Sequence, residues 1–300
     1  MCGIAGYVGD RESADVLVDA LSKLEYRGYD SAGIAVFDHG NIKVKKCKGR
    51  LANLVEKMDE EGKPQGHVGI GHTRWATHGE PSDINSHPHG NKRVTIVHNG
   101  IIENYKKLKD FLVGEGYSFA SETDTEVAAK LLDYYYDGDP MKTIAKVLSE
   151  IKGSYALGIM FRDFPDEIFA VRKDSPLIVG VGEHENFIAS DVPAILKYTR
   201  NVYYIGNMEI GRLADGNITF YNLDGDEIEK ELVEIKWDAE AAEKGGYEHF
   251  MMKEIHEQPK AIADTLNSVL KDGKLDLSAV ELSDEEIKKI SQIYIVACGS

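Results

Sequence analysis

The order of the predicted elements indicates an α+β fold with antiparallel sheets. Strands dominate up to residue 104, helices fill most of 105–151, and strands return after Gly153. Strands followed by helices and again by strands are typical of layered α+β domains, whereas α/β folds alternate strand and helix. A dinucleotide-binding fingerprint also fails, because Glu185 stands where the Gly180-Val-Gly182 stretch would need a third glycine.

Short strands and two helices are predicted in the N-terminal part. Gly3 to Val8 is an apolar strand, and Ser13 has the side chain of a helix N-cap. The helix that follows is predicted to pack inward through apolar residues at helical spacing, namely Ala14, Leu17, Leu21 and Leu24. Another helix is predicted over 51–58, and strands over 35–37, 42–47, 68–71 and 94–97.

Three helices then precede the second group of strands. Apolar positions predict them within 105–112, 127–135 and 144–151, and Pro140 has the place of a first-turn residue in the third. The later strands are predicted over 155–161, 168–172, 177–181, 186–189, 202–205 and 218–221.

Composition limits the classes of protein to which the chain can belong. The 300 residues are 42% hydrophobic and carry a formal net charge of −16, which argues against a nucleic-acid or anionic-membrane partner. The sequence has no signal peptide and no stretch of the ~20 apolar residues that span a membrane. Three widely separated cysteines do not suggest disulfides. We therefore expect a soluble, cytoplasmic protein.

We expect one complete domain and the beginning of another. Residues 2–221 form the predicted α+β domain, and the acidic, sparsely apolar stretch 222–246 begins a linker that continues as helix to residue 289. The segment 290–300 ends in an apolar strand and a glycine turn. Because a domain should not end on its first strand, the sequence is expected to be a fragment of a longer protein.

The opening Met1-Cys-Gly-Ile-Ala-Gly6 contains the strongest candidate for a nucleophile. Removal of Met1 would leave Cys2 with a thiol and a free α-amino group, and a pKa near ~8 suits that amine to act as a base at neutral pH. The thiolate is the attacking form of cysteine, so a neighbouring base would assist it. The alternative is a cysteine that only packs in an edge strand.

Further residues could complete a site for an amino acid that carries a side-chain amide. The planar guanidinium of Arg74 can pair with a carboxylate through two hydrogen bonds, and Asp124 can bind an ammonium group. Asn99 and Gly100 offer a side-chain amide and an unhindered backbone N–H to a developing oxyanion. Taken alone, Arg74 and Asp124 have simpler explanations, a surface ion pair and a helix cap.

Five histidines within a short span pose the question of a metal site: His67, His72, His78, His87 and His89. Neither an H-E-x-x-H motif nor a pair of cysteines accompanies them, and Pro88 and Gly90 place the last two in a loop. We predict no metal and no cofactor, and we expect Cys47 and Cys298 to be inert packing residues.

Five segments together resemble the glutaminase domain of the glutamine–fructose-6-phosphate aminotransferases: Cys2–Gly6, Glu25–Gly33, His72–Gly79, His98–Asn104 and Ser121–Glu126. The opening Cys-Gly-Ile-x-Gly is shared with other class II amidotransferases, but His-Thr-Arg-Trp-Ala-Thr-His-Gly is much more specific. The likeness continues through 252–259 and 296–300, which resemble the family's junction and the opening of its sugar isomerase domain. Ser300 stands where that family has threonine.

The resemblance implies a four-layer αββα sandwich of the Ntn-hydrolase type, and it implies roles for particular residues. Cys2 would be the nucleophile with its own α-amine as base, and Asn99 with the Gly100 amide would form the oxyanion hole. Arg74 would bind the glutamine carboxylate and Asp124 its amino group. The remaining implied roles are Thr77 and His78 as pocket lining, Trp75 as the gate of an ammonia channel, and Arg27 and Tyr29 in a loop that closes the site.

The same resemblance implies L-glutamine as substrate and, through a C-terminal domain that this sequence lacks, fructose 6-phosphate as acceptor of the ammonia. The product would be glucosamine 6-phosphate, and the full-length enzyme would be a homodimer. Two alternatives stay open. The phosphoribosyl-pyrophosphate amidotransferases fit Trp75, Thr77 and His78 less well, and a non-catalytic glutamine sensor or metal-binding protein would need no free α-amine at Cys2.

Overall fold

The computed structural model describes residues 2–91, 93–214, 216–236, 247, 249–271, 274–275 and 283–294. They belong to two units, 1–239 and 240–300, and each unit is described by itself. Every candidate site residue lies in the first unit.

Two antiparallel sheets form the centre of the first unit. One has the order β15-β11-β9-β10-β1-β4-β2-β3 and the other β14-β13-β12-β8-β7-β6-β5. The strands of the first sheet are β1 (Gly3–Gly9), β2 (Ser31–Asp38), β3 (Asn41–Lys48), β4 (Val68–Arg74), β9 (Ile178–Val181), β10 (Glu185–Ala189), β11 (Asn201–Tyr204) and β15 (Val233–Glu234). Those of the second are β5 (His89–Gly90), β6 (Val94–Ile102), β7 (Gly153–Phe161), β8 (Glu167–Lys173), β12 (Ile210–Ala214), β13 (Asn217–Tyr221) and β14 (Glu227–Ile228).

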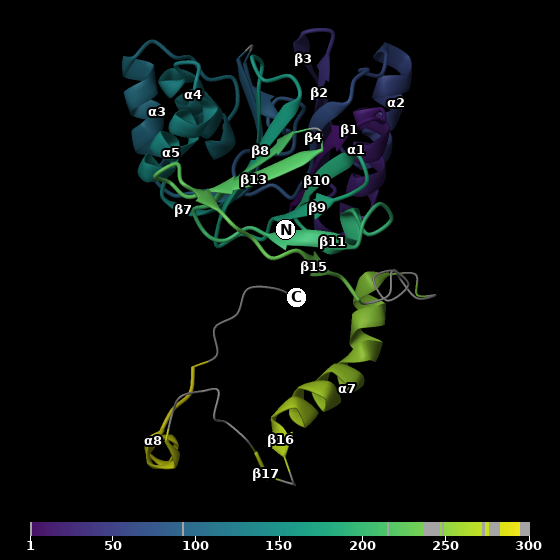
Figure 1. Cartoon of the computed structure of the whole chain (residues 1–300), viewed down its shortest axis with the longest axis vertical. Helices are drawn as coiled ribbons and strands as arrows, with labels where there is room; N and C mark the ends of the chain where they lie inside the picture. Colours follow the sequence, from purple (N-terminus) through teal and green to yellow (C-terminus); the bar gives the residue numbers. More distant parts are fainter. Residues whose placement is uncertain are drawn as a thin grey trace. The chain divides into compact units, whose positions relative to one another are not determined.

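The helices lie on the two outer sides of this pair of sheets (Figure 1). One side holds α1 (Ser13–Ser22) and α2 (Leu51–Glu61), and the other holds α3 (Tyr105–Gly114), α4 (Asp124–Tyr135) and α5 (Pro140–Glu150). Single 3-10 turns occur at Glu25–Arg27 and Val192–Ala194. The result is the four-layer αββα sandwich, so the predicted fold class is confirmed.

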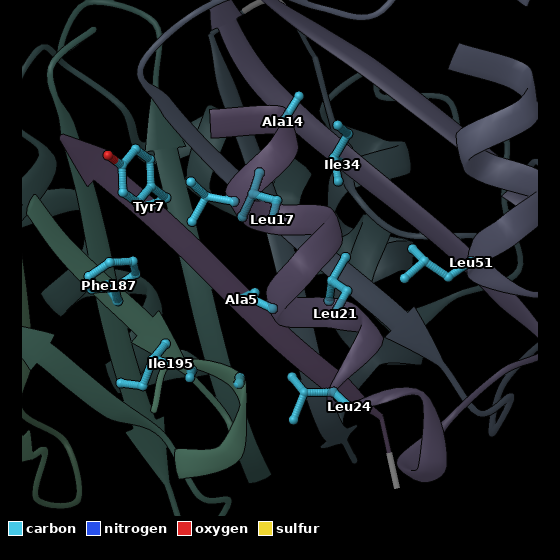
Figure 2. Close-up of a cluster of buried hydrophobic side chains, with 14 of the residues drawn as sticks. Ala5, Tyr7, Ala14, Leu17, Leu21, Leu24, Ile34, Leu51, Phe187 and Ile195 are labelled. Carbon is cyan, nitrogen blue, oxygen red and sulfur yellow. The ribbon is translucent and has the colours of Figure 1, made fainter. Parts of the chain in front are cut away.

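Three clusters of buried apolar side chains fill the spaces between the four layers. The first joins α1 and α2 to the outer face of the first sheet, and Figure 2 shows side chains of this cluster, among them Leu17 and Leu21 of α1 and Ala5 of β1. The second joins α3, α4 and α5 to the second sheet. The third lies between the sheets and includes Ile4 and Val8 of β1. Residues of β1 therefore alternate between two buried layers, as strand geometry requires.

Several strands are longer than the sequence predicts. We expected 68–71 and 94–97, but β4 continues through Arg74 and β6 through Ile102. The residues at these strand ends are polar, whereas β-propensity favours apolar and β-branched residues. Backbone pairing continues regardless, as in the register of Thr73 with Gly3 and of Asn99 with Ala156. The site residues therefore stand within the sheets and not beyond them.

Helix starts are partly as predicted. Pro140 is at the start of α5, whose N-cap Asp139 accepts hydrogen bonds from the Met141 and Lys142 N–H groups. The prediction of Ser13 as N-cap is wrong: Ser13 is the first residue of α1, and Glu12 is at the N-cap without a side-chain cap bond. The strand β12, which pairs with both β8 and β13, was not predicted from the sequence.

Residues 222–236, expected to begin a linker, contribute short strands to both sheets. Phe220 of β13 pairs with Ile228 of β14, and Val202 of β11 pairs with Val233 of β15. The second unit contains the 20-residue helix α7 (Phe250–Val269), the two-residue strands β16 (Leu270–Lys271) and β17 (Lys274–Leu275), and α8 (Asp284–Lys289).

Part of the predicted terminal strand lies in the described region. Ile293 and Tyr294 are irregular in backbone and 77% and 78% exposed. The remainder, with Cys298, lies outside the described residues. Within those residues, no helix combines the length and the apolar character that a membrane crossing requires.

Candidate active site

Cys2 immediately precedes β1, a central strand of the first sheet. Gly3 pairs with Thr73 of β4, so Cys2 lies beside the end of that strand. A Cβ on Gly3 would stand 2.6 Å from Thr73 Oγ1 and 2.7 Å from Leu24 Cβ, so only glycine allows this approach. The Cys2 thiol is 3.4 Å from the Trp75 carbonyl oxygen, to which it donates, and it accepts the Trp75 N–H at 3.1 Å. The edge-strand explanation of Cys2 is therefore wrong.

The surroundings of the thiol do not by themselves produce a thiolate. Burial raises the pKa of Cys2 above its usual value, and the hydrogen bond from the Trp75 N–H opposes that rise. A nucleophile in this state needs a base that removes its proton.

Asn99 and Gly100 stand in β6 of the second sheet and face Cys2 across the gap between the sheets. The Asn99 side-chain NH₂ donates to the Cys2 carbonyl oxygen at 3.0 Å. Gly100 has a φ of +114°, and a Cβ there would lie 2.0 Å from the Ser154 carbonyl oxygen. Position 100 therefore requires glycine.

Arg74, the last residue of β4, is 3% exposed, so the surface-ion-pair explanation is wrong. Its Nη2 donates to the carbonyl oxygens of His78 and, at 3.0 Å, Gly79. Within the described residues, the buried Nη1 has no hydrogen-bond partner, although Arg74 lines the cavity at Cys2. Burial lowers the pKa of Arg74, against the charges of Asp30, Cys2 and Asp124. An anionic ligand would satisfy this guanidinium.

Asp124 is the first residue of α4 and not its cap. The N-cap is Thr123, whose hydroxyl accepts the Glu126 N–H at 3.2 Å, so the helix-cap explanation of Asp124 is wrong. One oxygen of Asp124 accepts the Ile102 N–H at 2.8 Å, which fixes the buried carboxylate beside β6. Asp124 lines the same cavity as Arg74.

One cavity of about 300 Å³ collects almost all the candidate residues. Of the predicted site residues it is lined by Cys2, Arg27, Arg74, Trp75, Thr77, His78, Asn99, Gly100 and Asp124. It is also lined by residues to which the sequence analysis gave no role in the site: His87, His98, Ile101, Thr123, Thr125, Ser175 and Pro176. A volume of this size is at the lower end of small-molecule sites.

Tyr29 is the one predicted residue outside that lining. Its ring meets the Trp75 ring edge-on at 5.3 Å, and both side chains are nearly half exposed. Arg27, in contrast, is buried and donates to the Asp191 carboxylate at 2.9 Å. Trp75 therefore makes two separate contacts: its backbone contacts the Cys2 thiol, and its ring contacts Tyr29. The backbone contact was not indicated by any feature of the sequence.

Four buried histidines lie in or next to the site: His87 and His98 line the cavity, His72 contacts Asn99, and the His89 ring contacts His87. The rings of His72 and His87 stack at 4.1 Å, and His98 is joined to the Thr125 hydroxyl at 2.9 Å. Burial is the main cause that lowers the pKa of all four, to about 3 for His72. Across the described residues no group of three or more His, Cys, Asp or Glu side chains is arranged to hold a metal ion.

Cys47 lies away from this site. It is buried in the cluster between the first sheet and its helices, and it is a free thiol whose pKa is raised by burial. This is the environment that we expected for a packing cysteine.

Comparison with known proteins identifies the class. A family model described as a glutamine amidotransferase domain matches residues 72–197. Among solved structures, the glutamine phosphoribosylpyrophosphate amidotransferase of B. subtilis with ADP and GMP is 26% identical with a TM-score of 0.65, over 74% of this chain and 49% of that one. Residues 72–197 are therefore similar to a glutamine amidotransferase domain, and the first unit has the Ntn-hydrolase fold of these enzymes.

Curated relatives narrow the class further. Glutamine–fructose-6-phosphate aminotransferase [isomerizing] of Caldanaerobacter subterraneus subsp. tengcongensis is 57% identical over 303 residues, and that of Methanosarcina mazei 47% over 315. Each match covers 100% of this chain and 50% of the relative, so the chain spans about half the length of the relatives that it matches. The resemblance to the N-terminal half of the glutamine–fructose-6-phosphate aminotransferases is confirmed.

A conservative change at Arg74 tests the anion-binding function of its side chain. Arg74→Lys keeps the charge but loses the fork of two N–H donors, so KM for glutamine should rise by roughly 10- to 100-fold, the effect of one charge-assisted hydrogen bond. Steady-state kinetics measure it, with Arg212→Lys as the control because Arg212 pairs with Glu167 on β8. An unchanged KM with a lower kcat would mean that Arg74 does not bind the carboxylate.

The buried histidines predict a loss of stability in weak acid. A histidine whose pKa is lowered by folding binds fewer protons in the folded than in the unfolded state. The free energy of unfolding should therefore fall as the pH drops from ~6.5 towards ~5, by up to roughly 1.4 kcal/mol per pH unit for each histidine. Urea unfolding across this range measures the slope.

Two variants test whether the buried histidines cause the dependence of the free energy of unfolding on pH. His89→Gln should make it shallower, whereas His184→Gln, at an exposed position, should leave it unchanged. A free energy of unfolding that stays constant between pH 7 and 5 would contradict the prediction.

Proposed function

We propose that this chain hydrolyses L-glutamine to glutamate and ammonia. The observation that carries the proposal is the set of groups on one cavity: a thiol, an amide donor, a guanidinium nitrogen that has no partner in the part of the chain that the structure describes, and a carboxylate. A guanidinium and a carboxylate at fixed positions match the two charged groups of an amino acid, and the thiol then faces its side chain.

The first half of the reaction would form a thioester. We infer that Met1, which lies outside the described residues, is removed, so that the α-amine of Cys2 accepts the thiol proton. The sulfur attacks the side-chain amide carbon, and the negative charge moves to the amide oxygen. Asn99 and the Gly100 N–H stabilise this oxyanion. When the intermediate collapses, the C–N bond breaks, and the nitrogen takes the proton from the α-ammonium and leaves as ammonia.

The second half would release glutamate. A water molecule gives a proton to the α-amine and attacks the thioester carbon. The oxyanion forms again at the same donors, the C–S bond breaks, and the proton returns to the sulfur. The same groups therefore serve both steps, and the thiol is restored.

Other residues would retain and enclose the substrate. Thr77 and His78 line the cavity and would contact the bound amino acid. Arg27 and Trp75 also line the cavity, and Tyr29 contacts the Trp75 ring; these residues would close the site, and Trp75 would direct the ammonia.

The names of the relatives support a further step in a longer protein. The ammonia would pass to fructose 6-phosphate in a C-terminal domain, giving glucosamine 6-phosphate for hexosamine synthesis in a cytoplasmic homodimer. We propose a glutaminase domain that extends beyond the expected boundary at 221 to residue 236, because β14 and β15 belong to its sheets, followed by a linker up to 289 and the start of a sugar isomerase domain at 290–300. The chain is 57% identical to a glutamine–fructose-6-phosphate aminotransferase but 26% identical to a phosphoribosylpyrophosphate amidotransferase, which favours fructose 6-phosphate as the acceptor.

Replacement of the nucleophile tests the central claim. Cys2→Ser keeps the α-amine, but its hydroxyl ionises far less readily than a thiol, so glutamine should bind while hydrolysis is almost abolished. A glutamine analogue with an electrophilic side chain should label the wild type once, at Cys2, as read by peptide mass spectrometry. The Cys47→Ser control should be labelled like the wild type. Undiminished labelling of Cys2→Ser would place the nucleophile elsewhere, and a retained Met1 in the active protein would exclude the α-amine as base.

The proposed division of labour between the domains gives another test. The 300-residue chain, incubated with glutamine and fructose 6-phosphate, should release glutamate and ammonia in equal amounts and form no glucosamine 6-phosphate. Chromatography of the products measures both. An amino sugar formed by this chain alone would contradict the assignment of the acceptor site to another domain.

A further inference from the structure

His72 contacts the side chain of Asn99 from the opposite sheet. His72 stands in β4 and is 0% exposed, and its Nε2 lies 3.0 Å from Asn99 Oδ1 and 3.0 Å from the His98 carbonyl oxygen. A carbonyl oxygen of the backbone can only accept, so Nε2 must carry the proton in order to make this bond. The tautomer of His72 is therefore determined by a group that cannot rotate.

That tautomer determines which way round the Asn99 amide lies. With Nε2–H as donor, Oδ1 faces His72 and the NH₂ group faces Cys2, where it donates to the Cys2 carbonyl oxygen at 3.0 Å. The flipped amide would set two donors against each other at His72 and two acceptors against each other at Cys2. Both hydrogen bonds would be lost in a buried place, which is costly.

The other nitrogen of His72 is consistent with this arrangement. Nδ1 is buried and, among the residues that the structure describes, has no hydrogen-bond partner. In the Nε2–H tautomer it carries only a lone pair, and an unpaired acceptor is a smaller penalty than an unpaired N–H. The ring is held from its face by His87, stacked at 4.1 Å and 17°.

His87 is itself fixed by its neighbours. Its Nδ1 accepts the His98 N–H at 3.3 Å, and its Nε2 lies 3.3 Å from the Thr125 hydroxyl. The support behind Asn99 therefore runs from β4 through His72 and His87 to the start of α4.

We propose that His72 is a positioning residue that holds the NH₂ of Asn99 towards the oxyanion of the amide hydrolysis. The inference rests on the proposed function for the identity of the reaction. It assigns to His72 no contact with substrate and no transfer of a proton. Its effect is on the transition state through Asn99, so it should appear in kcat and not in glutamine binding.

Two substitutions at position 72 distinguish the effect of the Nε2–H donor from the effect of the volume of the ring. His72→Leu fills the site without a donor, and kcat should fall by about 10- to 1,000-fold, up to the effect of deleting one oxyanion donor. His72→Gln places an amide N–H near the place of Nε2 and should recover much of that loss. KM for glutamine should stay within a few-fold in both. A kcat for His72→Leu within twofold of the wild type would overturn the proposal.

A double-mutant cycle tells positioning from a general structural role. In an Asn99→Ala background, His72→Leu should lower kcat no further, because the amide that His72 orients is already absent. An equal loss in both backgrounds would overturn the proposal. Alkylation of Cys2 by iodoacetamide, which forms no oxyanion, should proceed at the wild-type rate in His72→Leu.

Nitrogen NMR of the unmutated protein tests the geometry independently of folding in the variants. The Nε2 of His72 should be protonated and Nδ1 unprotonated at neutral pH, and the Nδ1–H tautomer would overturn the inference. Failure of the proposed function would appear differently, as a wild-type chain that hydrolyses no glutamine while this tautomer is present.

Discussion

The pairing of β1 with β4 is the constraint on which the site depends. It sets Gly3 against Thr73, and the missing Cβ of Gly3 lets the strands and the Leu24 side chain come together. Once this register is fixed, the thiol before β1 must lie at the Trp75 backbone beyond β4. A shift of one residue would turn every side chain of β1 to the opposite face, so Ile4 and Val8 would leave the space between the sheets and enter the layer packed against α1.

The gap between the sheets changes in character along its length. Over most of it, apolar side chains of both sheets pack together, whereas near Cys2 the facing residues are polar, with His72 from one sheet and Asn99 from the other. Charged rings at this depth would carry a large desolvation penalty. Neutral imidazoles avoid it and still offer one donor and one acceptor each, which explains why the polar region of this gap is built from histidine.

The fold class and the residues with chemically distinctive side chains could be predicted from the sequence. Cys2, Arg74, Asn99 and Asp124 all meet on one cavity, and the motifs around them carried the resemblance. Contacts made by the backbone could not be predicted, since the hydrogen bond from the Trp75 N–H to sulfur depends on strand register and not on side-chain type. The lining by Ser175 and Pro176 was missed for another reason: these common loop residues follow β8, far along the chain from the motifs.

The length of β6 was also not predicted from the sequence, because Asn99 and Gly100, which lie within this strand, are unusual strand residues. Successive side chains of a strand point to opposite faces, so a side chain at position 100 would point away from that of Asn99. Asn99 uses its side chain, while Gly100 has none and lines the same cavity with its backbone. Its φ of +114° and the closeness of the Ser154 carbonyl exclude any other residue there. A donor from a side chain followed by a donor from the backbone therefore requires a polar residue and then glycine within a paired strand, which in sequence looks like the start of a turn.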